Sequence, residues 1–173
     1  MDEFSDGNFN DFKAPNSEAV RAVEFSGFGG DFFSTGSDGF IYKWNLDDLD
    51  AEPQVIAEAN NEYSNREIRI SPDKRWMVVT SDSSDVRLYN MQDMEKAPVV
   101  LDNHDGFVRD VEFMPDNSGL ITLGYDRKLV FYDFNRSRVL KRTENNINRF
   151  KIAPDNRTIY AGTTDGKVIR LPI

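Results

Sequence analysis

The sequence predicts an all-β protein built from four copies of one four-stranded antiparallel unit. A tight turn followed by a strand that ends on a large side chain occurs four times along the 173 residues. The residues that open these turns are Asp38, Ser83, Asp126 and Asp165. The large residues six positions later are Trp44, Tyr89, Tyr132 and Leu171. No helical stretch interrupts the repeat, so we expect strands throughout.

The spacing of the copies predicts the architecture. The residues that open the turns lie 45, 43 and 39 positions apart, and a period of about 40–45 residues is typical of a propeller blade. We expect a β-propeller of four-stranded antiparallel blades, four blades per chain, complete in itself or as a half-propeller completed by a second chain. The expected boundaries are a flexible acidic tail at 1–7, a closing outer strand at 8–14, and repeats at 15–57, 58–101, 102–143 and 144–173.

The third repeat shows the expected strand order most clearly. Residues 107–113 alternate between apolar and polar side chains, which places Val111 and Phe113 on the side that needs burial. A turn at 114–119 follows, in which Pro presets φ and Asp, Asn and Gly tolerate a tight backbone. Similar Pro-Asp turns occur at 70–75 and 152–157. The strands expected in the third repeat cover 98–101, 107–113, 120–124 and 129–134.

These repeats resemble the WD-repeat β-propeller family along residues 9–173. The strands that close the four repeats end in WN, YN, YD and LP rather than Trp-Asp, so the resemblance rests on the period and the turns. In that family a His, a Ser or Thr, an Asp and a Trp form a structural tetrad. The resemblance implies tetrad-like residues at His104, Thr122, Asp126 and Tyr132 in the third repeat, and at Ser34, Asp38 and Trp44 in the first, where Asn16 takes the His place.

Composition and motifs argue against catalysis. His104 is the single histidine and there is no cysteine, so we expect it to be a buried donor rather than a base or metal ligand. The sequence shows no nucleophile elbow and no phosphate-binding loop. The acidic clusters at 46–52 and 81–85 lack the ligand spacing of a calcium loop. We expect no catalytic residue, no cofactor and no metal.

The charge balance limits the classes of partner. The formal net charge is −9, whereas binding to a nucleic acid duplex needs a cationic surface. No apolar run is long enough to span a membrane, and the acidic N-terminus is no secretory signal. We expect a cytoplasmic protein that binds neither nucleic acid nor membrane and whose partner is a protein.

Arginines recur at one position of the repeat. Because partners of the resembled family dock around the start of the innermost strands, we expect partner-binding residues at Arg21, Arg66, Arg109, Arg149 and Tyr125. Arginine suits bidentate capture of a carboxylate or phosphate, and an exposed Tyr is a plausible anchor. The alternatives are that each arginine pairs with a neighbouring acid such as Glu67, Asp110 or Glu112, and that Tyr125 packs within its turn.

The ends of the chain leave three arrangements open. The fourth repeat stops at its third strand, and residues 8–14 have the offset of the missing outer strand. One chain can close as a four-bladed ring, two chains can exchange residues 8–14 in an eight-bladed ring, or the chain can belong to a longer polypeptide. We favour assembly, by homodimerisation or with other chains.

The predicted function is that of a non-enzymatic protein–protein interaction scaffold that presents a rigid propeller face and is completed by homodimerisation. The alternative is a structural or regulatory propeller segment of a larger multidomain enzyme or sensor. An enzyme built on the propeller channel would need converging acids or a metal inside it.

Overall fold

The protein consists of four antiparallel sheets arranged in a row. The computed structural model describes Pro15 and residues 18–27, 29–58, 63–102, 104–134, 136–144 and 146–173. The first sheet contains β1 (Val20–Phe25), β2 (Asp31–Gly36), β3 (Phe40–Asn45) and β4 (Gln54–Glu58). The second contains β5 (Asn65–Ile70), β6 (Trp76–Ser81), β7 (Val86–Asn90) and β8 (Val99–Leu101).

The remaining two sheets repeat this order. The third contains β9 (Val108–Phe113), β10 (Leu120–Gly124), β11 (Lys128–Tyr132) and β12 (Ser137–Arg142). The fourth contains β13 (Ile147–Ile152), β14 (Thr158–Thr163) and β15 (Val168–Pro172). The prediction of an all-β fold with four propeller blades is confirmed. The expected tail at 1–7, the expected closing strand at 8–14 and Asn16 lie outside the described residues.

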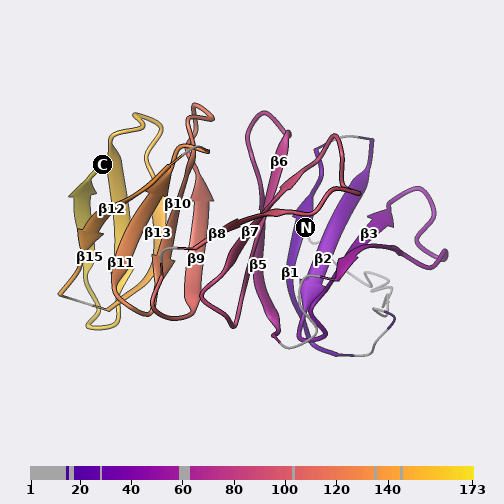
Figure 1. Cartoon of the computed structure of the whole chain (residues 1–173), viewed down its shortest axis with the longest axis horizontal. Coiled ribbons are helices and arrows are strands. Elements are labelled where there is room, and N and C mark those ends of the chain that lie inside the picture. The colour runs from indigo at the N-terminus through magenta and orange to yellow at the C-terminus, as the bar shows by residue number, and fades with distance from the viewer. Residues whose placement is uncertain are drawn as a thin grey trace, which may run out of the picture.

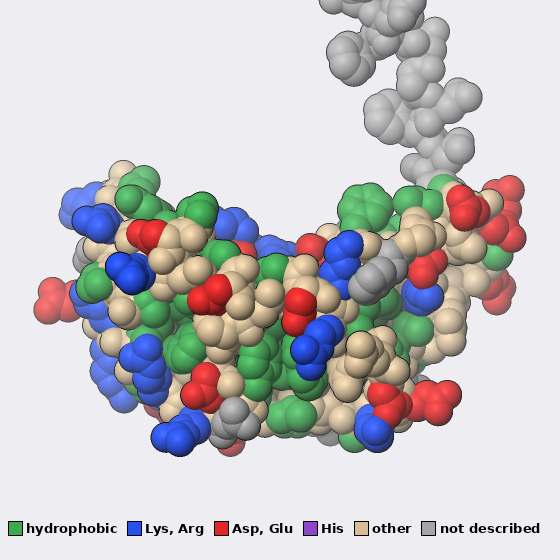
Figure 2. Space-filling view, turned by 90° about the horizontal axis from the view of Figure 1, so that it is seen from above, with side chains coloured by type: hydrophobic (Ala, Val, Ile, Leu, Met, Phe, Trp, Pro, Cys, Tyr) green, Lys and Arg blue, Asp and Glu red, His purple; other side chains and the backbone are tan. Residues whose placement is uncertain are grey.

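The blades contact one another in sequence order. The innermost strand β5 packs against β1 and β2 of the first blade, β9 packs against β5 and β6, and β13 packs against β9. The first and fourth blades lie at opposite ends of the row (Figure 1). Seen from above, the molecule is hollowed between these ends, with hydrophobic side chains on both sides of the hollow (Figure 2). The described part of the chain therefore forms an open arc and does not close into a ring by itself.

Apolar clusters between neighbouring sheets hold the blades together. Each blade has a forward face, toward the next blade, and a backward face, toward the previous one. Side chains on the forward face of one blade meet those on the backward face of the next, as with Phe33 and Ile41 of the first blade against Ile68 and Tyr89 of the second. The same arrangement joins the second blade to the third and the third to the fourth. Burial of apolar surface between sheets is thus the main stabilising contribution.

The Pro-Asp turns lie side by side and connect the blades along one edge. In each turn one residue adopts a positive φ: Lys74, Asn117 or Asn156, at 61°, 61° and 55°. The side-chain oxygen of Asn117 accepts a hydrogen bond from the Asp73 amide at 2.9 Å. In the same way, Asn156 accepts one from the Asp116 amide at 3.2 Å. Asn tolerates a positive φ well. The two Asn residues that adopt this conformation in the turns therefore also link adjacent blades.

A buried hydrogen-bond network fixes the third blade. Nδ1 of His104 lies 3.0 Å from Oδ1 of Asp126, and its Nε2 lies 2.7 Å from the hydroxyl of Thr122. Asp126 also accepts hydrogen bonds from the amides of Asp105, at 2.9 Å, and Lys128, at 3.1 Å. Burial lowers the pKa of His104, so the neutral ring donates through Nδ1 and accepts through Nε2. Both ring nitrogens are engaged in holding the turn to the sheet.

In the first blade, the tetrad-like residues form a different set of hydrogen bonds. The indole Nε1 of Trp44 donates to Oγ of Ser34 at 2.7 Å. Asp38 accepts hydrogen bonds from the Phe40 amide at 3.1 Å and the Tyr42 hydroxyl at 2.8 Å. In the third blade, Tyr132 stands where Trp44 stands in the first, and it packs in the apolar cluster between the second and third blades. The aromatic residue at this position therefore packs in an apolar cluster in both blades. In the first blade it also forms the hydrogen bond between Trp44 and Ser34.

Candidate interaction site

The predicted partner-binding residues line one hollow. Arg21, Arg66 and Arg109 are each the second residue of an innermost strand, and Asn148 holds that position in β13. Because the four innermost strands stack around the concave side, these positions converge. They surround a hollow of about 320 Å³, called here the arginine hollow. Its lining consists of Arg21, Arg66, Glu67, Arg109, Tyr125, Asn148 and Arg149.

Two of the arginines share one carboxylate. Arg21 lies 3.5 Å from Asp82 and also donates to the hydroxyl of Ser37 at 3.1 Å, while Arg66 forms an ion pair with the same Asp82. Asp82 was not predicted as a partner, because it belongs to the acidic cluster at 81–85, which was compared only with a calcium loop. Its position directly after β6 was the available signal, since β6 pairs with β5, which carries Arg66.

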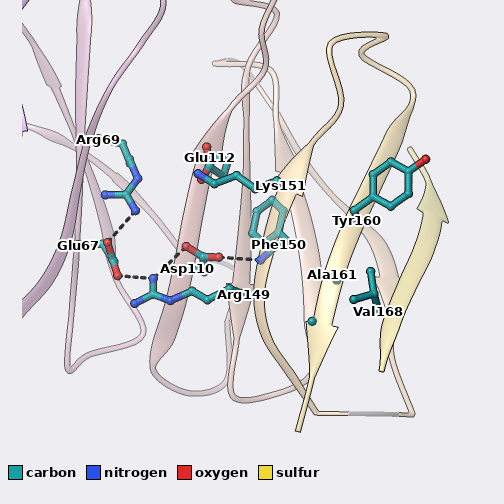
Figure 3. A pocket seen from close by; sticks show the side chains of 11 residues that line it. Glu67, Arg69, Asp110, Glu112, Arg149, Phe150, Lys151, Tyr160, Ala161 and Val168 are labelled. Atoms are coloured by element: carbon teal, nitrogen blue, oxygen red, sulfur yellow. Dashed lines mark hydrogen bonds and ion pairs between the residues drawn. The ribbon is translucent and has the colours of Figure 1, made fainter. Parts of the chain in front are cut away.

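Arg149 belongs to a chain of ion pairs that includes the buried carboxylates of Glu67 and Asp110. It contacts both Glu67 and Asp110, the latter at 3.1 Å, and Glu67 also accepts from Arg69 at 3.0 Å (Figure 3). Asp110 additionally accepts the Phe150 amide hydrogen at 2.9 Å. Burial raises the pKa of Asp110, and the hydrogen bonds from Phe150 and Arg149 act against this increase. Arg149 therefore pairs with neighbouring acids, as the alternative in the sequence analysis expected.

Arg109 differs from the other three arginines. Among the residues that the structure describes it forms no ion pair. Its guanidinium donates to the Asn148 side chain at 2.6 Å and lies 5.0 Å from the centre of the Tyr125 ring. Tyr125 is 53% exposed and meets the 47% exposed Phe107 edge to face. The hollow therefore combines a cation without a carboxylate partner and an exposed aromatic pair, of which Phe107 was not predicted.

The described part of the chain offers no candidate metal site beside the hollow. Within the described ranges no three His, Cys, Asp or Glu side chains gather closely enough to hold a metal ion. A search of the same residues for an apolar helix of membrane-spanning length finds none. His104, the only histidine, is buried in the network of the third blade, where it contacts Asp126.

The fold and the hollow define a class of protein. It is a repeat protein of propeller blades whose innermost strands expose a polar and aromatic surface at the arginine hollow. The model of the family described as "WD domain, G-beta repeat" matches residues 96–133, which contain the network of His104 and Asp126. The match covers one repeat, and together with the four-blade fold it supports the similarity of this chain to the WD-repeat family. The repeats indicate a protein-interaction scaffold.

Two curated relatives share this similarity. The chain is 25% identical over 140 residues to Protein SOF1 of Saccharomyces cerevisiae, a match that covers 78% of this chain and 28% of that protein. It is 21% identical over 167 residues to Protein hir-1 of Neurospora crassa, covering 80% of this chain and 16% of that protein. The chain thus spans less than a third of the length of the relatives it matches.

Proposed function

We propose that this chain is a non-enzymatic protein–protein interaction scaffold that presents the arginine hollow as a rigid docking face and is completed by homodimerisation. The observation that carries the proposal is the convergence of residues from all four blades on one hollow. Arg and Tyr are enriched among residues that dominate binding energy at protein interfaces. A partner that offers a carboxylate to Arg109 would supply the opposite charge that none of the described residues places beside this guanidinium.

Replacing Arg109 with Ala is expected to weaken partner binding by about tenfold, because truncation of a central Arg at an interface typically costs at least that much. The probes are acidic peptides selected against the wild-type chain from a display library, and the measurement is their Kd by calorimetry. Arg157→Ala is the matched control, since Arg157 is an exposed arginine in the Pro-Asp turn of the fourth blade. Equal affinities for wild type and Arg109→Ala would contradict the proposed docking face.

The homodimer follows from the open arc. Propellers usually contain about 4–8 blades, and ring closure protects their strand edges. Two copies of this chain together hold eight blades, and a pair related by a two-fold axis is the commonest closed assembly. The expected exchange of residues 8–14 would add the outer strand that the fourth blade lacks.

Light scattering on the purified chain is expected to give twice the monomer mass of 19.8 kDa. Deletion of residues 1–14 is expected to shift the mass toward that of the monomer, because the closing strand would be lost. A monomer mass for the wild-type chain at every concentration would overturn homodimerisation and leave the docking face untouched.

The second candidate is a structural or regulatory propeller segment of a larger multidomain enzyme or sensor. It is favoured by the matches to only 28% and 16% of the two relatives. In that case the blades that complete the ring would come from the same polypeptide. A wild-type monomer in light scattering would favour this candidate over the homodimer.

A further inference from the structure

The backward face of the first blade exposes side chains that every other blade buries. The fourth residue of the innermost strand is buried in the second, third and fourth blades, at Ile68, Val111 and Phe150, which are 0%, 0% and 2% exposed. In the first blade this residue is Val23, which is 53% exposed. Phe25, two positions later, is 63% exposed. The first blade therefore carries contact residues for a preceding blade that the described chain does not provide.

The forward face of the fourth blade is exposed in the same way. In each blade, the fifth residue of the innermost strand pairs with a residue on the second strand. In the first three blades this second-strand residue is Phe33, Val78 and Ile121. These side chains are 3%, 0% and 0% exposed. In the fourth blade it is Tyr160, which is 48% exposed. Val168, also on this face, is 78% exposed, although its equivalents in the other blades are buried. Both ends of the arc thus present blade–blade surfaces that no described residue covers.

A hollow of about 390 Å³ extends from the innermost strands of the second and third blades to the forward face of the fourth (Figure 3). Its lining includes the charged side chains of Glu67, Arg69, Asp110, Glu112 and Arg149. Phe150, Lys151, Tyr160, Gly162 and Val168 contribute to its lining. A Cβ added at Gly162 would meet no atom within 4 Å, so the surface beside Tyr160 and Val168 is open. An aromatic side chain such as Phe25 suits the apolar part of this lining, at Tyr160 and Val168.

Charges along the inner wall alternate in sign from blade to blade. The fifth residue of the four innermost strands is Glu24, Arg69, Glu112 and Lys151 in turn. Arg69 lies 3.9 Å from Glu24 of the preceding blade, and Lys151 forms an ion pair with Glu112. The series begins with an acid and ends with a base. A second copy placed end to end would therefore continue the alternation at both junctions.

We propose that a second copy of this chain docks end to end, with the forward face of the fourth blade of each copy against the backward face of the first blade of the other. Lys151 then lies beside Glu24 of the partner subunit, and Phe25 of the partner subunit enters the hollow beside Tyr160 and Val168. This assignment rests on the proposed homodimer and specifies which surfaces form it. Another propeller segment would fit only if it offered a base at one junction and an acid at the other.

The first test removes the apolar complementarity. Val168→Asp is expected to weaken the dimer at least about tenfold in sedimentation equilibrium, because it places a charge in an apolar contact. Val139→Asp is the matched control: Val139 is a 45% exposed valine on β12, away from both end faces. Since both valines are exposed, neither substitution is expected to unfold the chain, and circular dichroism checks this.

The second test exchanges the charges. Lys151→Glu and Glu24→Lys are each expected to weaken the dimer by about tenfold through like-charge contact at both junctions. The double variant Glu24→Lys/Lys151→Glu restores opposite charges there and is expected to recover part of the affinity. If the single substitutions weakened the dimer only by disturbing contacts inside each copy, the double variant would not recover affinity.

The outcomes separate this inference from the homodimer itself. A wild-type dimer that all the end-face variants leave intact would overturn end-to-end docking, while homodimerisation would stand. A wild-type monomer would overturn both. Loss of the dimer in Val168→Asp but not in Val139→Asp, with recovery in the double charge exchange, would support the assigned junction.

Discussion

Replacing Phe150 with Ala is expected to lower the free energy of unfolding by about 3–5 kcal/mol, the usual cost of truncating a buried Phe. Phe150 is 2% exposed and lies in the apolar cluster that joins the third and fourth blades. Ile121, Leu123 and Leu129 surround it from the third blade. Since these side chains belong to paired strands, they cannot collapse fully into the space left behind, and a cavity remains. Denaturant unfolding measures the loss.

Tyr63→Ala serves as the control for this substitution. Tyr63 is an aromatic residue of similar size that is 41% exposed, so its truncation leaves no enclosed cavity. We expect a loss of no more than about 1 kcal/mol there. Comparable losses for the two variants would mean that the burial of Phe150 between the third and fourth blades is not the reason for the effect.

Replacing Asp126 with Ala is expected to destabilise the protein by about 3–5 kcal/mol, because it removes one partner of a buried polar network. The Asp126 side chain is 8% exposed. Although burial acts to raise its pKa, hydrogen bonds from the Asp105 amide and from His104 hold the pKa of this carboxyl below its ordinary value. The folded state therefore favours the ionised form, and its loss leaves the His104 ring and two backbone amides without their acceptor.

Asp165→Ala is the matched control for Asp126→Ala. Asp165 is the equivalent residue of the fourth repeat, but its side chain is 44% exposed and pairs with the exposed Lys167. Exposed ion pairs typically contribute about 0–1 kcal/mol. Thermal or denaturant unfolding of both variants makes the comparison. If Asp165→Ala were as damaging as Asp126→Ala, burial would not be the reason for the effect.

Much of the fold could be predicted because the signals are local. The alternation in residues 107–113 puts Val111 and Phe113 on one side of a strand whatever lies beyond it. The Asn of the Pro-Asp turns tolerates the positive φ that Asn117 and Asn156 adopt. Such patterns depend only on neighbours in sequence, and their fourfold recurrence predicts the repeat.

The candidate site could be predicted only in part. The shared position of Arg21, Arg66 and Arg109 in the repeat indicated that these side chains would meet. Which of them would lack a carboxylate partner was not predictable, because that depends on contacts between blades. Asp82 pairs with Arg21 of the previous blade, whereas Arg109 meets Asn148 of the next one. Binding at this hollow remains a prediction.

The sequence by itself determined the strands, their turns and the repetition of one blade, since each follows from the chemistry of neighbouring residues. Only the tertiary structure decided which equivalent residues are buried. Val23 and Val111 occupy the same position in their strands, yet one is 53% exposed and the other 0%. The difference arises because the burial of a sheet face requires a second sheet against it. Within the described part of the chain, each end blade of this arc has a neighbour on one side only.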